Sequence, residues 1–293
     1  MEIKGIITAM VTPFDARGEI SEQGTKDLIR YLLGKGIDGL FILGTNGEFH
    51  VLEEKEKLTF AQYVIDEVSG QVPVYVGTGG NSTKQVITLS KQMEQLGADA
   101  LSVISPYFVP PTEHELVAHY TSIADAVTIP VLMYNIPKNT GVNITKEAVT
   151  VLARHENISG IKDSSGKLEN MVSYIHAAKG QTFNVLSGSD SLILSGLKSG
   201  ATGAVAATSN ALPEIDKAIY QLWKDGELEE AEAMQQRIDP FRTVLKLGTI
   251  PSVLKAAVGI RGIDVGGARL PVQPLSPASL QQVESVMKMH YEE

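Results

Sequence analysis

The sequence contains no cysteine, and this absence excludes disulfide bonds, thiolate metal ligands and a cysteine nucleophile. It has no long basic run, and its formal net charge of -9 disfavours a nucleic-acid partner, which needs a cationic surface. No apolar run approaches the ~20 residues that a membrane-spanning helix needs. The first residues, MEIKGIITAM, lack the apolar stretch of a secretory signal. We therefore expect a cytoplasmic protein without a nucleic-acid or membrane partner.

Two ligand-binding patterns are missing as well. None of the six histidines is followed by another four positions later, and no carboxylate pattern accompanies them, so we expect no metal site. The glycine-rich segment 77–80 lacks the spacing of a dinucleotide fingerprint or a phosphate-binding loop. The chemistry of this chain must therefore be sought in its own side chains.

The chain of 293 residues contains eight short apolar runs, each apolar at odd and even positions alike, which is typical of strands covered on both faces. They are 6–11, 40–43, 74–76, 101–104, 131–134, 158–162, 183–187 and 204–207. Segments between them, such as 58–68 and 86–96, have apolar residues three and four positions apart and predict helices. The count of eight, with roughly 25 to 30 residues per unit, favours a (β/α)8 TIM barrel over an open sheet.

Helix boundaries are marked by residues with clear end preferences. Expected N-caps are Ser21, Ser82, Thr112 and Thr145, and expected stop signals are Gly34, Gly70, Gly97 and Gly180. After about residue 210 the apolar runs end, and helices are predicted at 213–223, 227–247 and 251–258. The last two lie beyond the eight-unit pattern. We therefore divide the chain into a catalytic barrel, 1–225, and a C-terminal helical extension, 226–293.

Lys162 is the most informative residue, because it ends the sixth predicted strand and active sites of such barrels lie at the C-terminal strand ends. An unpaired ammonium inside the barrel is costly, and a neutral amine there can attack a carbonyl carbon. The alternative is a structural lysine in an ion pair with Asp163 or Glu48, and position alone favours that alternative.

Two neighbouring strand ends add polar groups. Tyr134 ends the fifth predicted strand, where its phenol could relay protons, although a tyrosine packed in the core is the more common arrangement. The turn 44–48 after the second strand offers backbone N–H groups and the Thr45 hydroxyl to a carboxylate. Glycine-rich turns also occur for geometry alone, so this turn is a weak signal by itself.

Taken together, the strand ends carry four motifs in a fixed order. These are Gly44-Thr45-x-Gly47-Glu48, Tyr134-Asn135-Ile136-Pro137 with Thr140-Gly141, Gly160-x-Lys162-Asp163, and Ser187-Gly188 before Asp190. On these motifs, nearly the whole chain resembles the dihydrodipicolinate synthase / N-acetylneuraminate lyase family of class I aldolases. The resemblance replaces the ion-pair interpretation of Lys162 with a catalytic one.

The resemblance implies roles for individual residues. Lys162 matches the lysine that forms the Schiff base, and Tyr134 matches the tyrosine that shuttles protons and contacts the substrate carboxylate. Thr45 and Asn46 match the pair that binds the carboxylate of pyruvate, and Thr45 also joins the proton relay. No cofactor is implied, because the covalent imine on Lys162 is itself the electron sink.

Further implications concern the rest of the pocket and the assembly. Gly188 and Val205 match backbone positions near the bound 2-oxo acid. The family is usually a homotetramer, a dimer of tight dimers. The implied partners are therefore a small 2-oxo acid, an aldehyde and further copies of the same chain.

Departures from the family pattern bear on the second substrate. Members that make dihydrodipicolinate usually carry an arginine where this chain has Asn139, and the ammonium of Lys138 does not copy its bidentate fork. They also carry a tyrosine pair after the fourth strand, of which the second crosses the dimer interface. Here the pair is Tyr107-Phe108, and a phenylalanine cannot pass a proton.

Sialic acid lyases have a glutamate directly after the position of Asp190, where this chain has Ser191. Asp190 could accept a substrate hydroxyl, or it could cap the helix after the seventh strand. We therefore expect a shorter substrate: a lyase or aldolase that acts on a 2-oxo-3-deoxy or 4-hydroxy-2-oxo acid. The alternatives are dihydrodipicolinate synthase itself, a dehydratase that uses the same imine, and a non-catalytic 2-oxo acid sensor.

Overall fold

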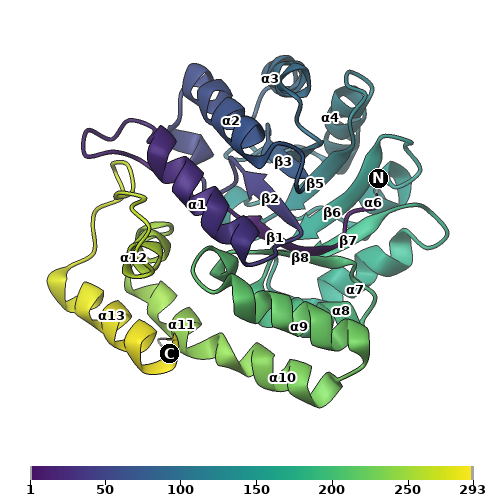
Figure 1. Ribbon diagram of the computed structural model, residues 1–293. Helices are drawn as coiled ribbons and strands as arrows, with labels where there is room; N and C mark the ends of the chain where they lie inside the picture. Colours follow the sequence, from purple (N-terminus) through teal and green to yellow (C-terminus); the bar gives the residue numbers. More distant parts are fainter. Residues whose placement is uncertain (1, 292–293) are drawn as a thin grey trace.

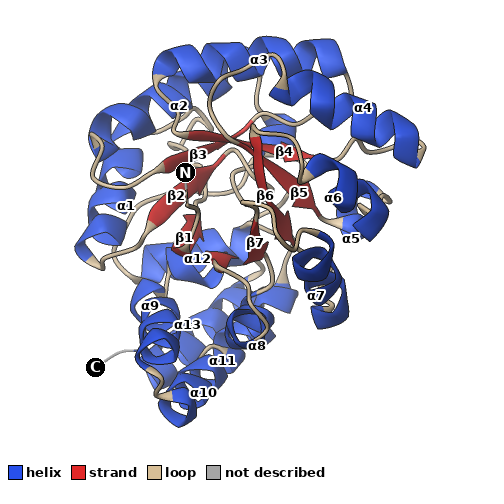
Figure 2. Ribbon diagram, turned by 90° about the vertical axis from the view of Figure 1, so that its right-hand side faces the viewer, coloured by secondary structure: helices blue, strands red, loops and turns tan. Residues whose placement is uncertain are grey.

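The computed structural model describes residues 2–291 and shows eight parallel strands that pair in chain order and close into a barrel (Figure 1). The strands are β1 (Gly5–Ala9), β2 (Gly39–Ile42), β3 (Val74–Gly77), β4 (Ala100–Ile104), β5 (Val131–Asn135), β6 (Ile158–Asp163), β7 (Asn184–Ser187) and β8 (Gly203–Ala206). The predicted (β/α)8 TIM barrel is confirmed, and each predicted apolar run overlaps one strand. Figure 2 shows the strands at the centre with helices around them.

Helices cover the barrel from outside. They are α1 (Glu22–Gly34), α2 (Glu54–Val68), α3 (Thr83–Leu96), α4 (Glu113–Ala124), α5 (Pro137–Thr140), α6 (Lys146–Leu152), α7 (Leu168–Ala177), α8 (Ile193–Lys198) and α9 (Pro213–Asp225). All four expected N-caps are confirmed: the side chains of Ser21, Ser82, Thr112 and Thr145 accept hydrogen bonds from backbone N–H groups of α1, α3, α4 and α6. Within residues 2–291, no helix combines the length and apolar character needed to cross a membrane.

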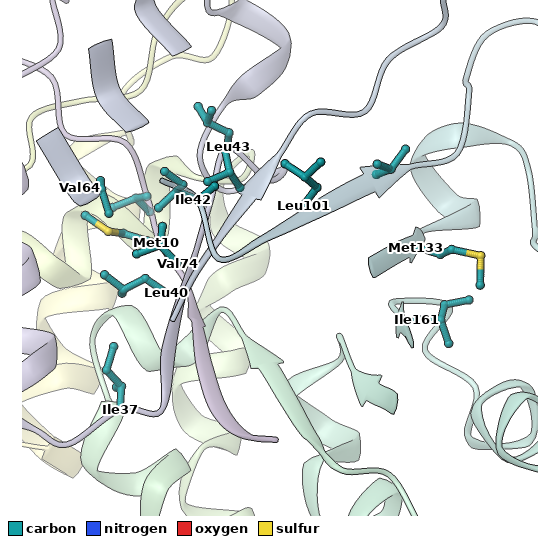
Figure 3. Close-up of a cluster of buried hydrophobic side chains, with 14 of the residues drawn as sticks. Met10, Ile37, Leu40, Ile42, Leu43, Val64, Val74, Leu101, Met133 and Ile161 are labelled. Atoms are coloured by element: carbon teal, nitrogen blue, oxygen red, sulfur yellow. The ribbon is translucent and has the colours of Figure 1, made fainter. Parts of the chain in front are cut away.

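Side chains alternate along each strand between the barrel interior and the layer under the helices. One core fills the barrel interior, with Phe41, Leu132, Tyr134 and Val205 among its members. The other lies between strands and helices and takes the residues of opposite parity, of which Figure 3 labels Leu40, Ile42, Leu101, Met133 and Ile161. This alternation explains why the runs are apolar at every position, and it decides which strand-end residues face the interior.

The C-terminal extension corrects one sequence prediction. The sequence predicts a single helix at 227–247, but the structure has two. The first, α10 (Leu228–Arg237), ends at Arg237, and the second, α11 (Asp239–Val244), begins two residues later. Pro240 explains the break, because it has no N–H to donate and its ring clashes with the preceding turn. The Tyr291 hydroxyl closes the gap: it donates to the Arg237 carbonyl (2.7 Å) and accepts from the Phe241 N–H (3.1 Å).

That tyrosine belongs to α13 (Pro277–Tyr291), which packs with α12 (Ser252–Ile260) and α11 beside the barrel (Figure 1). The sequence prediction names no individual helix beyond residue 258, so α13 is located by the structure alone. The division at residue 225 stays a prediction, although α9 does end there on a left-handed Gly226 (φ 84°).

Acid should weaken the fold through His119, a buried residue of α4 whose Nδ1 lies 2.8 Å from the Thr83 hydroxyl. Burial lowers the pKa of His119 from 6.5 to about 4. The unfolded chain therefore takes up a proton near pH 6.5 and the folded chain only near pH 4, so this contribution is complete above 6.5 and is lost as the pH falls toward 4.

We expect the free energy of unfolding to fall by about 2 kcal/mol more between pH 7 and pH 5 in the wild type than in His119→Gln. Urea unfolding at both pH values measures this difference. His114→Gln, on the exposed face of the same helix, is the matched control and should behave as the wild type does. Equal pH dependence of the wild type and His119→Gln would contradict the assignment.

Candidate active site

Lys162 and Tyr134 end neighbouring strands and point into the barrel together. They are register partners across β5 and β6, and both are 4% exposed. The Lys162 Nζ lies 4.1 Å from the centre of the Tyr134 ring and 4.3 Å from that of Phe41. The sequence had not singled out Phe41, although its parity on β2 predicts an interior side chain. The amine is thus enclosed by two aromatic faces, which also stabilise a cation at that position.

The two carboxylates considered as partners of Lys162 face elsewhere. Asp163 has the opposite parity and accepts hydrogen bonds from Asn135 Nδ2 (2.8 Å), Ser165 Oγ (2.7 Å) and Asn170 Nδ2 (3.1 Å). Glu48 pairs with another lysine. Among residues 2–291, no ion pair to Lys162 is found. The structural-lysine alternative therefore has no support in the geometry.

Thr45 connects the β2 turn to the tyrosine. Its hydroxyl lies 3.2 Å from the Tyr134 hydroxyl, and either group can donate. The turn passes close to the Phe41 ring, where a side chain at Gly44 would come within 2.4 Å. The next residue, Asn46, directs its amide nitrogen to the Ala9 carbonyl of β1 at 3.4 Å. The turn thus brings a hydroxyl and backbone groups beside the tyrosine.

Gly188 follows β7 and borders the lysine side chain. Its N–H donates to the Asp163 carbonyl (2.8 Å), and its carbonyl accepts from the Ser164 hydroxyl (3.1 Å). A Cβ at this position would lie 2.1 Å from Ser164 Oγ and 3.0 Å from Lys162 Cε. Val205, on β8, belongs to the same interior core as Tyr134. Both residues therefore lie on the interior side, as the sequence prediction requires.

Asp190 corrects a prediction. It does not cap the helix after β7: the short helix η2 (Asp190–Leu192) has no side-chain cap. Instead, its two carboxylate oxygens accept from the N–H groups of Ala207 (2.9 Å) and Thr208 (3.2 Å), directly after β8. Burial raises the pKa of Asp190, and those two backbone hydrogen bonds act against the rise. Its carboxylate is thus already committed to holding the end of β8.

Two predicted residues lie on the rim. Asn139 is exposed on the short helix α5. Phe108 is 91% exposed, with a left-handed backbone (φ 76°), while its neighbour Tyr107 packs edge-on against Phe49. Within one chain, neither Asn139 nor Phe108 joins the buried cluster around Lys162. Such a large exposed aromatic side chain in a strained conformation is unusual for a surface that faces only water.

Size alone does not locate the site. A groove of about 1190 Å³ lies outside the barrel and is lined by residues near Phe14, by the start of α2 and by the segment around Arg269. Its central charges already pair, since Arg269 forms an ion pair with Glu56. Within residues 2–291, no group of three or more potential ligand residues is placed to hold a metal ion. Chemistry therefore points to the barrel interior.

A (β/α)8 barrel with an unpaired interior lysine at the end of β6 and a tyrosine at the end of β5 defines a class I aldolase, a lyase that works through an imine. A model described as the dihydrodipicolinate synthetase family matches residues 2–290, and the chain belongs to this family. The predicted family and the predicted enzyme class are thus confirmed.

Individual relatives are similar along their whole length. The 4-hydroxy-tetrahydrodipicolinate synthase of Syntrophus aciditrophicus is 38% identical over 285 residues, which cover 97% of each chain. The solved structure of YagE from Escherichia coli K12, a prophage protein of the dihydrodipicolinic acid synthase family in complex with pyruvate, has a TM-score of 0.96, 35% identity and 99% coverage of each chain. Dihydrodipicolinate synthase DapA-2 from Bacillus anthracis has a TM-score of 0.95, 33% identity and 98% coverage of each.

We expect Gly188→Ala to slow imine formation by roughly 100-fold, because the added methyl displaces Ser164 and the Lys162 stem by an amount to which reacting groups are sensitive. The rate of covalent labelling by pyruvate and borohydride, followed by mass spectrometry, measures the effect. Gly34→Ala is the control, since a Cβ there meets nothing within 4 Å. A labelling rate for Gly188→Ala equal to that of the control would contradict the close approach.

Proposed function

We propose that the chain forms a Schiff base between Lys162 and pyruvate or another 2-oxo acid, and that it cleaves or condenses a 2-oxo-3-deoxy or 4-hydroxy-2-oxo acid. The observation that carries the proposal is the buried Lys162 amine, which has no ion-pair partner among residues 2–291 and is enclosed by the rings of Phe41 and Tyr134. The pyruvate in the YagE structure supports the choice of a 2-oxo acid.

The reaction begins at the lysine. The amine of Lys162 attacks the ketone carbon, and the resulting carbinolamine loses water to give a protonated imine. Tyr134 is placed to pass protons during this step, because its hydroxyl contacts Thr45 and its ring borders the amine. The aromatic faces that surround Nζ stabilise the positive charge of the iminium.

The iminium then acts as the electron sink. Loss of a proton from the adjacent methyl group gives an enamine, whose carbon attacks an aldehyde and forms the new carbon–carbon bond. In the reverse direction the 4-hydroxyl group loses its proton, the bond between C3 and C4 breaks, and an aldehyde leaves. The electrons of that bond give the enamine, which takes up a proton at C3 and becomes the iminium again. Water finally hydrolyses the imine and releases the 2-oxo acid. Each step needs one proton carrier beside Lys162, which is the role we assign to Tyr134.

The substrate carboxylate is assigned to the β2 turn. Its backbone N–H groups and the hydroxyl of Thr45 lie beside Tyr134, and Asn46 adds an amide. Gly188 and Val205 would border the bound acid from β7 and β8. Asp190 would act through the backbone after β8, because both of its oxygens are engaged there.

A second candidate is dihydrodipicolinate synthase activity, with aspartate semialdehyde as the aldehyde. Relatives that are 34–38% identical are named 4-hydroxy-tetrahydrodipicolinate synthase. Asn139 and Phe108 oppose it, since neither offers the charge or the proton that the family's synthases use there. Turnover of pyruvate with aspartate semialdehyde, compared with cleavage of a panel of 2-oxo-3-deoxy acids, separates the two candidates.

A dehydratase would use the same imine and would appear in the panel as loss of water. No relative supports a sensor without activity.

Incubation with pyruvate followed by borohydride should add one reduced pyruvyl group per chain, located on Lys162 by peptide mass spectrometry. Lys162→Ala should remain unmodified. Tyr134→Phe should keep the fold and slow turnover by about 10²–10⁴-fold, the usual contribution of a general acid–base group. A label that persists in Lys162→Ala would sink the proposal, and near-normal turnover of Tyr134→Phe would assign the proton transfer to another group.

We further propose that the enzyme is a cytoplasmic homotetramer in which Phe108 crosses the interface of the tight dimer. The exposure and strained backbone of Phe108, next to the 70% exposed Val109, support a covered position in the assembly. One similar solved structure is that of a monomeric dihydrodipicolinate synthase variant, so assembly varies among these proteins.

Phe108→Asp should therefore reduce the molar mass measured by light scattering, because a carboxylate would be desolvated in the interface. Val151→Asp, which changes another exposed apolar residue (55%), serves as the control and should leave the mass unchanged. Equal masses for the wild type and Phe108→Asp would remove Phe108 from the interface.

A further inference from the structure

A second buried lysine lies outside the catalytic cluster, in the C-terminal extension. Lys255 of α12 forms an ion pair with Glu48, with Nζ and Oε1 2.8 Å apart and both side chains 1% exposed. Its ammonium also donates to the Gly267 carbonyl (2.8 Å) and lies 4.0 Å from the centre of the Phe14 ring. The extension thus reaches the barrel through a fully buried charge pair.

Glu48 is the last residue of the β2 turn that carries Thr45. Its backbone is left-handed (φ 55°), and its N–H donates to the Thr45 carbonyl at 3.2 Å. Its second carboxylate oxygen accepts a hydrogen bond from the backbone N–H of Arg269 at 2.8 Å. Any movement of the Glu48 side chain is therefore passed to Thr45 through one short turn.

The rest of the turn is held by uncharged groups. Thr12 donates to the Gly47 carbonyl at 2.7 Å, and Asn46 makes a 3.4 Å contact to β1. The buried side chain of Glu48 is the charged group that fixes the turn to the helices beyond the barrel. The partners of its carboxylate belong to the segment 255–269, far away in sequence.

The energetics argue against a purely stabilising role. Removing two charges from water costs about as much as their attraction returns, and an apolar pair of equal size is often as stable. What a buried ion pair does provide is a defined distance and direction between the elements that carry it. The β2 turn needs this property, because its hydroxyl must stay within hydrogen-bonding distance of Tyr134.

We propose that the Glu48–Lys255 ion pair is a positioning device by which the C-terminal extension holds the β2 turn in the geometry that binds the carboxylate of the 2-oxo acid. The inference rests on the proposed function of Lys162 and Thr45. Neither Glu48 nor Lys255 touches the substrate; they act through Thr45 and the backbone of the turn.

The neighbouring pair between Arg269 and Glu56 offers a matched control. It joins the same C-terminal segment to α2 and is partly exposed, 18% and 23%. It does not contact the turn 44–48 through its side chains. Glu56→Gln removes the charge of this outer pair and leaves both partners of the Glu48 carboxylate, Lys255 and the Arg269 backbone N–H, unchanged in sequence.

The test uses Glu48→Gln, Lys255→Met, the double variant and Glu56→Gln in the full-length chain. For each, borohydride trapping on Lys162 is measured against pyruvate concentration, together with the melting temperature. We expect the half-saturating pyruvate concentration to rise by about tenfold or more in the first three variants. This is the effect expected when a hydrogen bond from the β2 turn to the pyruvate carboxylate loses its alignment. The maximal extent of labelling should stay at one per chain, and Glu56→Gln should saturate as the wild type does.

The double variant guards against misfolding, because it leaves no uncompensated buried charge where a single variant does. If it keeps a wild-type melting temperature and still needs more pyruvate, the positioning role is supported. If all variants with a native fold saturate like the wild type, the pair is only structural and the inference is overturned. Absence of any label in the wild type would instead overturn the proposed function of Lys162, so the two failures are distinct.

Discussion

The alternation of side chains along β6 is the constraint on which the site depends. Lys162 faces the barrel interior because its neighbours, Ile161 and Asp163, face the helices. The Asp163 carboxylate accepts hydrogen bonds on that outer side, from Asn135 among others, and so does not form an ion pair with Lys162. A shift of one residue in the register would place the carboxylate inside and the amine outside. The amine is thus kept free of a counter-charge by the parity of a strand.

The barrel closure turns this local arrangement into a site. Parallel strands that pair in chain order bring the ends of β2, β5, β6 and β7 around one interior, although they are separated by many residues along the chain. Tyr134 arrives as the register partner of Lys162, and Thr45 arrives from β2 to meet the tyrosine hydroxyl. Lys162 and Tyr134 lie on strands, which hold side chains more firmly than loops do and so suit chemistry that is sensitive to small displacements.

The two residues that the sequence singles out as departures from the family pattern lie outside the buried cluster around Lys162. Asn139 and Phe108 are exposed, whereas Lys162 and Tyr134 are buried in the barrel interior. Asp190 shows why the sequence left two alternatives open, of which the structure does not support capping. Its position after β7 is typical of a cap for the following helix, whereas the carboxylate crosses to the backbone after β8. The partner strand, not the residue's own segment, decided its role.

Much of the fold could be predicted because its causes are local. Runs apolar at both parities, helical spacing between them and capping residues such as Ser21 and Thr145 act within a few residues, and they place the strands and most helices. The break at Pro240 was missed because the apolar spacing continues across it. The motifs at the strand ends, and with them Lys162 and Tyr134, were also visible in the sequence. Only the tertiary structure could show that Phe41 covers the amine and that Asp163 forms hydrogen bonds on the outer side of β6. The ion pair between Glu48 of the β2 turn and Lys255 of the extension was likewise visible only there. These contacts join residues far apart in the chain. They form only when the barrel closes and the C-terminal extension packs beside it, and no local sequence pattern determines them.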